Sequence, residues 1–191
     1  VLDLLNANTD YVNNIIGVDN YDYGHIVSQG NGGGIARLRA SCQDNIKAAG
    51  ATSLNAPEGD FFDVDYVAHE MGHNFGGNHT QNNNCNYSSS AGMEPGSGST
   101  IMSYAGICSP NVQNQVDDYY HGRSIDEMTT HFELGNGGCG TIINTSLNNA
   151  IIISPEDETI PAGTPFVLTS GATGNGSISY NWEQYDVERG E

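Results

Sequence analysis

The stretch HEMGHNFGGNHT at residues 69–80 decides how the rest of the sequence is interpreted. It holds three of the six histidines of the 191-residue chain, together with one glutamate and two adjacent glycines. His69 and His73 are four positions apart, so on a helix their Cβ atoms lie on one face, about 5–6 Å apart. Two imidazoles at that separation can bind one cation through Zn–N bonds of about 2.0–2.1 Å. The stretch therefore predicts a helix that carries a zinc site.

The third histidine of the stretch, His79, requires a reversal of the chain. On a continuous helix it would lie about 9 Å beyond His73 and on another face. The glycines at 76–77 permit the positive φ that a reversal needs. Three histidines leave the fourth position of a zinc site open to water, which is the catalytic arrangement, whereas a purely structural site would need a fourth side-chain ligand. Glu70 is turned about 100° from His69 and is predicted to be the general base.

The composition indicates a globular protein with a strongly acidic surface. Five basic and 23 acidic residues give a net charge of −18. This charge makes nucleic acid and membrane surfaces poor partners, and no apolar run approaches the roughly 20 residues that span a bilayer. It suits cationic peptides or calcium, although a solubilising surface explains it more simply. Residues 57–65 are the most acidic calcium candidate, but no EF-hand loop is present.

The four cysteines and the beginning of the sequence point to a processed, secreted protein. Four cysteines permit three pairings, and none lies in a C-x-x-C pair. Two structural disulfides in a secreted protein are predicted, and the alternative is four unpaired buried thiols. The sequence starts without a signal-peptide pattern or an initiator methionine. We therefore expect a piece of a longer product.

Hydrophobic periodicity predicts two helices before residue 77. The first covers residues 1–17 and ends at Gly17. The second follows an N-cap at Asp63 and ends at Gly76 in a left-handed conformation. Its predicted buried face consists of Val64, Val67, Ala68, Met71 and Phe75.

A third helix and several short elements complete this part of the chain. The helix is predicted over residues 124–132, with Ser124 and Glu127 as an S-x-x-E capping box. Extended segments are expected at 21–27 and 35–40, a glycine-rich turn at 30–34, a helical turn at 45–49 and a loop at 80–100. The other histidines lack ligand spacing and are interpreted as structural or surface groups: His25, His121 and His131.

The composition changes after Cys139. Short β-like runs at 151–153, 165–169 and 177–184 are separated by Pro, Gly and Asn, and the third contains Trp182. They resemble the opening strands of an immunoglobulin-like sandwich. Because such sandwiches need about seven strands, the segment is predicted to be an incomplete domain, with a boundary near 140–150.

The extended pattern HExxHxxGxxH resembles that of the metzincin zinc peptidases. The downstream sequence IMSY at 101–104 is similar to the Met-turn, in which the methionine, here Met102, lies under the metal. The resemblance implies Zn²⁺ held by His69, His73 and His79, with Glu70 activating water to hydrolyse internal peptide bonds.

Within the metzincins, residues 20–140 are most similar to reprolysin-like (adamalysin-type) peptidases, especially secreted bacterial ones. This resemblance implies the disulfides Cys42–Cys139 and Cys85–Cys108. It also implies a substrate edge strand that contains Gly33, Gly34, Ile35 and Ala36.

Two positions depart from the reprolysin pattern. Thr80 stands where these peptidases typically have aspartate after the third histidine. The Ser103-Tyr104 pair is closer to the astacins and serralysins, so Tyr104 is a candidate fifth ligand or transition-state hydrogen-bond donor, with packing as the alternative.

The prediction is therefore an α+β protein with two parts. Residues 1–143 form a metzincin-like catalytic domain, with a mixed sheet over the zinc helix and its N-terminal part missing, and residues 144–191 begin the sandwich. A companion fragment or chain can complete the domain. The function is a secreted zinc endopeptidase acting on proteins or peptides, and the alternative is a catalytically inert extracellular binding or adhesion protein.

Overall fold

The computed structural model describes residues 1–143, 151–174 and 177–187, and the chain divides into two units. The first comprises residues 1–141 together with a C-terminal segment that begins at Glu183, and the second comprises residues 142–182. Within the described residues, no helix is both long enough and apolar enough to cross a bilayer.

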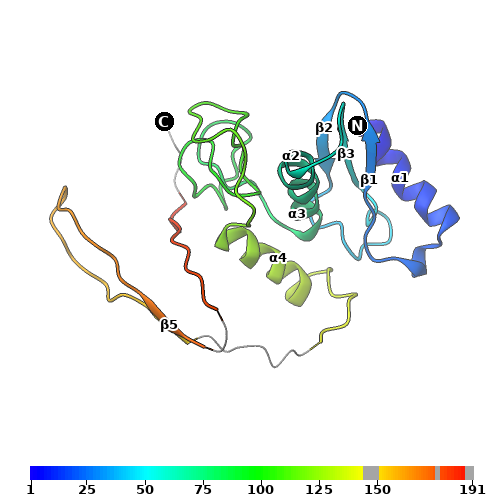
Figure 1. Ribbon diagram of the computed structural model, residues 1–191. Helices are drawn as coiled ribbons and strands as arrows, with labels where there is room; N and C mark the ends of the chain where they lie inside the picture. The colour runs from blue at the N-terminus through cyan, green and yellow to red at the C-terminus, as the bar shows by residue number, and fades with distance from the viewer. Residues whose placement is uncertain (144–150, 175–176, 188–191) are drawn as a thin grey trace. The chain divides into compact units, whose positions relative to one another are not determined.

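The first unit is built around a three-stranded mixed sheet. Its strands are β1 (Ile26–Gln29), β2 (Gly33–Ala36) and β3 (Gly50–Leu54), in the order β1-β3-β2. β1 is parallel to β3 and β2 is antiparallel to it, so β2 is an edge strand. Helix α1 (Leu2–Ile15) lies on one face of the sheet, and helix α3 (His69–Phe75) lies on the other (Figure 1). This arrangement confirms the predicted α+β fold with a mixed sheet over the histidine-bearing helix.

The apolar core lies between α1 and the sheet. Leu5 of α1 and Ala51 of β3 are buried, at 3% and 0% exposure. Ile26 and Ile35 are both register partners of Ala51, so their side chains share its face. The predicted helix over residues 1–17 is confirmed, because its apolar stripe closes this core.

The histidine-bearing helix begins earlier than predicted. Helix α2 (Asp60–Phe62) follows Gly59 and continues into the π-helical segment η2 (Asp63–Ala68) and then into α3. The predicted N-cap at Asp63 is therefore wrong, because that residue is already helical.

The predicted buried face of this helix is also wrong. The wider π-helical turns shift the side chains relative to a 3.6-residue period, and all five predicted positions are only half-buried. The fully buried residues of α3 are His69, Glu70, Gly72 and Asn74. The C-cap at Gly76 is confirmed, with φ 115° and ψ −5°.

Helix α4 (Gly122–Leu134) packs against α3 and covers the predicted third helix. The predicted capping box is wrong. The helix starts two residues before Ser124, and His121 is the N-cap, with its ring Nδ1 accepting the Arg123 N–H at 3.0 Å. Glu127 instead binds Asn78, 49 positions away in sequence.

The sheet differs from the prediction in two respects. Strand β3 was not predicted, although it lies at the centre of the sheet. The predicted strand over 35–40 ends at Ala36, because Arg39 has a positive φ of 58°. Gly33 and Gly34 belong to β2 rather than to a turn. Between β1 and α1 lies the short 3-10 helix η1 (Val18–Asn20).

Two disulfides link distant segments. Cys42 after β2 is bonded to Cys139 after α4, and Cys85 is bonded to Cys108, with Cα–Cα distances of 5.5 Å and 6.2 Å. These are the two pairs that the family resemblance implies. The loop over residues 80–100 carries only the isolated β-bridge between Gln81 and Glu94.

The described residues of the second unit hold a two-stranded antiparallel sheet, β4 (Ile151–Ile153) and β5 (Gly171–Thr173). The predicted strand at 151–153 is confirmed. Those over 165–169 and 177–184 are wrong, because their described residues form no strand. The predicted start of the second domain, at residue 144, lies outside the described residues. The immunoglobulin-like sandwich stays a prediction.

Candidate metal centre

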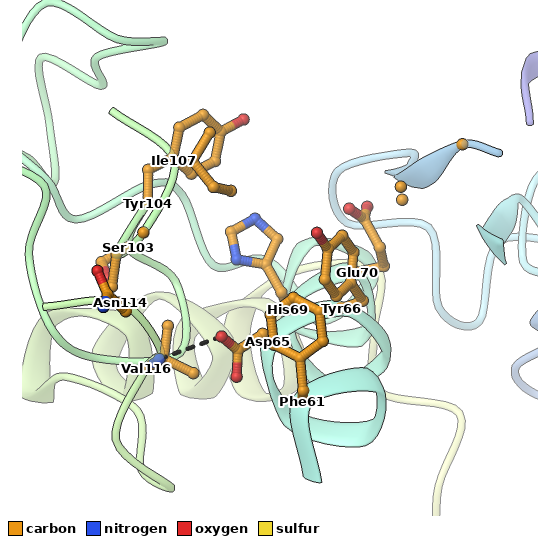
Figure 2. A pocket seen from close by; sticks show the side chains of 15 residues that line it. Phe61, Asp65, Tyr66, His69, Glu70, Ser103, Tyr104, Ile107, Asn114 and Val116 are labelled. Carbon is orange, nitrogen blue, oxygen red and sulfur yellow. Dashed lines mark hydrogen bonds between the residues drawn. The ribbon is translucent and has the colours of Figure 1, made fainter. Parts of the chain in front are cut away.

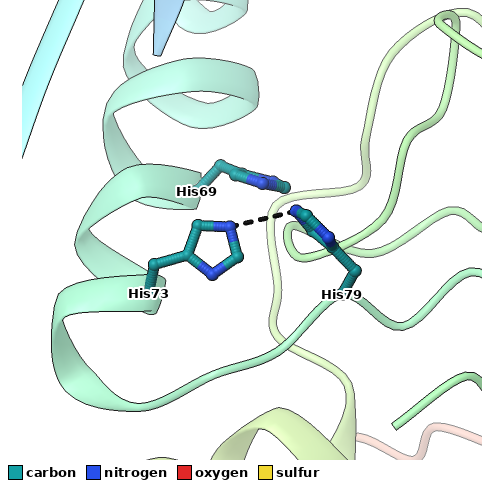
Figure 3. Close-up of side chains that lie close together, drawn as sticks. All are labelled: His69, His73 and His79. Carbon is teal, nitrogen blue, oxygen red and sulfur yellow. Dashed lines mark hydrogen bonds between the residues drawn. The ribbon is translucent and has the colours of Figure 1, made fainter. Parts of the chain in front are cut away.

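The chain reversal after α3 brings three histidines together. His69 and His73 project from successive turns of α3, and the left-handed Gly76 ends the helix. The N–H of Gly77 then donates to the Gly72 carbonyl, at 2.8 Å, which fixes the turn. His79 returns to the same place, so that ligand nitrogens of the three rings lie within 4.8 Å of one another (Figure 3). Within the described residues, this is the only such group of metal-binding side chains.

Each imidazole is oriented by a backbone carbonyl. His69 Nδ1 lies 2.7 Å from the Ile101 oxygen, His73 Nδ1 lies 2.8 Å from the Gly77 oxygen, and His79 Nδ1 lies 3.0 Å from an oxygen of the loop. A carbonyl can only accept, so each Nδ1 must carry the proton. Each Nε2 then presents a lone pair, which is the tautomer that metal-ligating histidines adopt.

The Nε2 atoms of His73 and His79 are 3.0 Å apart (Figure 3). Because both Nδ1 atoms are protonated, this contact brings two lone pairs together, and a cation between them would remove the repulsion. Two nitrogens on one tetrahedral zinc ion are separated by about 3.3 Å, given bond lengths of about 2.0–2.1 Å. The three histidines therefore fit a divalent ion such as Zn²⁺.

Burial keeps the three rings in the neutral, ligating form. Burial lowers the pKa of His69 well below its ordinary value, and the neighbouring imidazoles lower it further. Burial also lowers the pKa of His73, and it lowers the pKa of His79 to about 4. The site is thus prepared for a cation without prior deprotonation at neutral pH.

Glu70 lies beside the triad without belonging to it. Its side chain is 7% exposed, and burial raises its pKa to about 8. It packs directly against β2, where a Cβ at Gly34 would overlap its carboxylate. Gly34 is therefore required for the position of Glu70.

Met102 lies in the turn packed against the histidine-bearing helix. Its side chain is fully buried, and a Cβ added at Gly72 would overlap its sulfur. The preceding residue, Ile101, provides the carbonyl that orients His69. The Thr80 N–H donates to the Met102 carbonyl, so the turn also supports the third histidine.

Tyr104 packs beside the triad. Its ring centroid is 4.5 Å from that of His79 and 5.8 Å from that of His69. Its hydroxyl accepts a hydrogen bond from the Asn86 amide at 2.9 Å and keeps its own hydrogen for donation. Burial raises the pKa of Tyr104, so the hydroxyl stays protonated at neutral pH.

Asn86 is a residue that the sequence analysis missed. Its backbone oxygen orients His79 and its side chain holds Tyr104, so it connects two parts of the site. It has a positive φ of 56°, which asparagine tolerates better than most residues. Its position in an Asn-rich run gives no signal that singles it out.

Glu94 is a second residue that the sequence did not predict. It accounts for a threonine at position 80, where reprolysin-like peptidases typically have aspartate. The Glu94 carboxylate is buried and accepts hydrogen bonds from the hydroxyls of Thr80 and Thr100. It also accepts the N–H groups of Ser99 and Thr100, at 2.8 and 3.0 Å. A carboxylate is therefore bound to the side chain of Thr80, the residue that follows the third histidine, although Thr80 itself is uncharged. No spacing rule connects residues 80 and 94.

Two cavities border Glu70 on either side of its contact with β2. One, of about 400 Å³, adjoins Gly32–Gly34 and residues 103–107 (Figure 2). The other, of about 650 Å³, adjoins Gly34–Ala36, Leu38 and the loop residues 86–90. The predicted substrate strand thus lies along both cavities.

The remaining histidines and the acidic stretch do not belong to the metal-binding group. His25 contacts Thr52 Oγ1 at 2.8 Å, His131 contacts Ser41 Oγ at 2.9 Å, and His121 caps α4. Residues 57–65 form no cation-binding group within the described part of the chain. One of them, Asp65, accepts the Val116 N–H at 3.2 Å.

The three converging histidines, the buried glutamate beside them and the buried Met102 against the same helix agree with the metzincin resemblance of the sequence. The model of the reprolysin-like metallopeptidases of family M12B matches residues 2–130. The chain therefore belongs to this family. A search of curated proteins found no match to the chain.

Proposed function

We propose that the protein is a secreted, zinc-dependent endopeptidase that hydrolyses internal bonds of proteins and peptides. One observation carries the proposal: three imidazoles with fixed Nδ1–H tautomers converge beside a buried glutamate that is not one of them. The two disulfides favour an oxidising compartment and so support secretion.

His69, His73 and His79 would hold the zinc ion and leave a coordination position free. The ion supplies Lewis acidity, which acidifies water and polarises a carbonyl oxygen. Glu70 accepts the proton of the attacking water and delivers it to the leaving amine. Burial raises the pKa of Glu70 to about 8 in the metal-free site, and a zinc ion beside the carboxylate would favour the ionised form that accepts the proton.

Tyr104 is proposed as a hydrogen-bond donor rather than a fifth ligand. Its hydroxyl already accepts from Asn86, so its hydrogen is available to the oxygen that becomes negative in the transition state. Met102 supports the site by packing under the histidine-bearing helix.

The substrate is proposed to bind as an extended strand along β2. That strand pairs with β3 on one side only, and its other edge offers backbone groups to an additional strand. Backbone pairing explains binding of many polypeptides, whereas the two cavities are available for side chains. The division into a catalytic domain over 1–143 and a sandwich beginning at 144 is part of the proposal.

The test is Glu70→Gln, which keeps the shape of the side chain and removes its basicity. We expect the variant to bind one zinc per chain and to hydrolyse a denatured protein at least about 100-fold more slowly. Glu58→Gln, at an exposed glutamate near the same helix, is the matched control and should retain the wild-type rate. Wild-type activity in zinc-loaded Glu70→Gln would contradict the mechanism. No zinc-dependent hydrolysis by the wild-type protein would favour the inert binding protein instead.

A further inference from the structure

The cavity of about 400 Å³ beside Glu70 has an uneven charge distribution. Two of its lining side chains are acidic, Glu70 and Asp65, none is a lysine or arginine, and the one histidine is the proposed zinc ligand His69. The Asp65 carboxylate lines the cavity, below His69 and between Val116 and the Phe61 ring in Figure 2. Because Glu70 has a role in the proposed reaction, Asp65 is the charge left to meet a substrate side chain. We call this space the Asp65 cavity.

The walls of the Asp65 cavity suit a long side chain with an apolar stem. Phe61 and Tyr66 pack edge to face, with ring centroids 5.3 Å apart. Ile107 adds an aliphatic wall on the opposite side and is 64% exposed (Figure 2). Aromatic rings also attract cations that lie over their faces.

The surroundings of Asp65 favour a positive group next to it. Burial raises the pKa of Asp65, and the nearby carboxylate of Asp118 raises it further, although the Val116 N–H opposes both effects. A cation in the cavity would offset the desolvation and the repulsion together. The structure therefore leaves a partly desolvated carboxylate with no lysine or arginine among the cavity residues.

The position of the cavity along β2 determines which substrate residue reaches it. The Asp65 cavity adjoins Gly32–Gly34, and the second cavity adjoins Gly34–Leu38. Antiparallel strand pairs are slightly more stable per residue than parallel pairs, so we expect the substrate strand to run antiparallel to β2, from the second cavity to the Asp65 cavity. The side chain that follows the scissile bond then enters the Asp65 cavity.

We propose that the Asp65 cavity binds a lysine or arginine side chain, so that the enzyme cleaves on the amino side of basic residues. This inference rests on the proposed peptidase function. The stem of the basic residue lies between Phe61, Tyr66 and Ile107, and its cationic end pairs with the Asp65 carboxylate. The net charge of −18 adds long-range attraction for basic substrates.

The test compares two peptides that differ only in the residue after the scissile bond, arginine or leucine, for three proteins. The wild-type protein should cleave the arginine peptide about tenfold or more faster in kcat/KM. Asp65→Asn keeps an acceptor for the Val116 N–H and removes the charge, and it should bring this ratio close to one. Asp63→Asn, at an exposed aspartate of the same helix, should keep the wild-type ratio. A preference for leucine, or an unchanged ratio in Asp65→Asn, would overturn the inference while leaving the peptidase function intact.

A binding measurement decides the inference if no peptide is cleaved. Calorimetry with Glu70→Gln should show about tenfold tighter binding of the arginine peptide than of the leucine peptide. Adding Asp65→Asn to this variant should abolish the difference. Equal affinities of Glu70→Gln for the two peptides would overturn the inference, whereas absent cleavage by the wild-type protein alone contradicts only the peptidase proposal.

Discussion

The two faces of the three-stranded sheet differ in chemistry although they belong to the same strands. On the face toward α1, Ala51 packs with Leu5, Ile26 and Ile35 in an apolar core. On the face toward α3, the alternate residue Thr52 meets His25.

Glycines provide the space on the α3 face. A Cβ at Gly50 would overlap the side chains of His25 and Asn74, and a Cβ at Gly34 would overlap Glu70. The Asn74 amide donates to the carbonyls of Arg37 and Ala49, at 2.9 and 3.0 Å. One face therefore stabilises the fold by burial, and the other provides space and hydrogen bonds for the site.

The largest expected effect comes from filling the space on the site face. Gly34→Val should displace the Glu70 carboxylate and lower kcat/KM at least about 100-fold, because the general base leaves its position. The zinc content should not change. Ile35→Val, one residue further on the opposite face, is the control and should cost about 0.5–1.5 kcal/mol of stability with little loss of activity. Equal activities of the two variants would contradict the division between faces.

Substitutions on the apolar face should change mainly the stability of the protein. Leu5→Ala removes a buried side chain from the core and should lower the free energy of unfolding by about 2–5 kcal/mol. Urea unfolding of the metal-free protein measures this loss. The affinity of the folded variant for zinc should match that of the wild type, and a parallel loss of affinity would show that the two faces are not independent.

Substitution of Asn86 should have a smaller effect than the two preceding changes, and this effect should be on the zinc affinity. Asn86→Ala keeps the carbonyl that binds His79 but strains the positive φ and removes the contact with Tyr104. We expect zinc affinity to fall about tenfold, as is typical for groups that orient ligands. Asn86→Gly tolerates the backbone conformation and should lose less. Competition with a chromogenic chelator measures both, and the opposite order would refute a role for the backbone geometry.

The pH dependence of stability reports on the buried titratable groups of the polar face. Burial lowers the pKa of His25 to about 4, whereas an unfolded histidine titrates near about 6.5. The native state therefore binds fewer protons between these values, and the contribution of His25 to stability is complete above about 6.5 and lost as the pH falls towards 4. Glu70 acts in the opposite sense, because its pKa is raised to about 8 and its contribution is lost as the pH rises towards that value.

Urea unfolding of the metal-free protein between pH 4.5 and 8 tests these signs. His25→Asn should reduce the loss of stability on acidification. Glu70→Gln should reduce the loss on approaching pH 8. A steeper acid loss in His25→Asn would contradict the proposed cause.

The sequence predicted the parts of the site that follow from local spacing. Helix geometry places His69 and His73, four residues apart, on one face. It also excludes His79 from that face unless the helix ends, and the breaker at Gly76 ends it. These two facts predict that the triad converges. Strand β3 was missed because its sequence, GATSL, lacks alternation, and it is buried only because neighbours cover both faces. Asn86 and Glu94 were missed for a related reason: their partners come from other segments of an irregular loop.

X-ray absorption at the zinc edge of the loaded protein tests the central claim most directly. The account predicts three imidazole nitrogens and one oxygen at about 2.0–2.1 Å, with one imidazole lost in His79→Ala. A sulfur ligand, a fourth side-chain ligand or an unchanged spectrum in His79→Ala would contradict it.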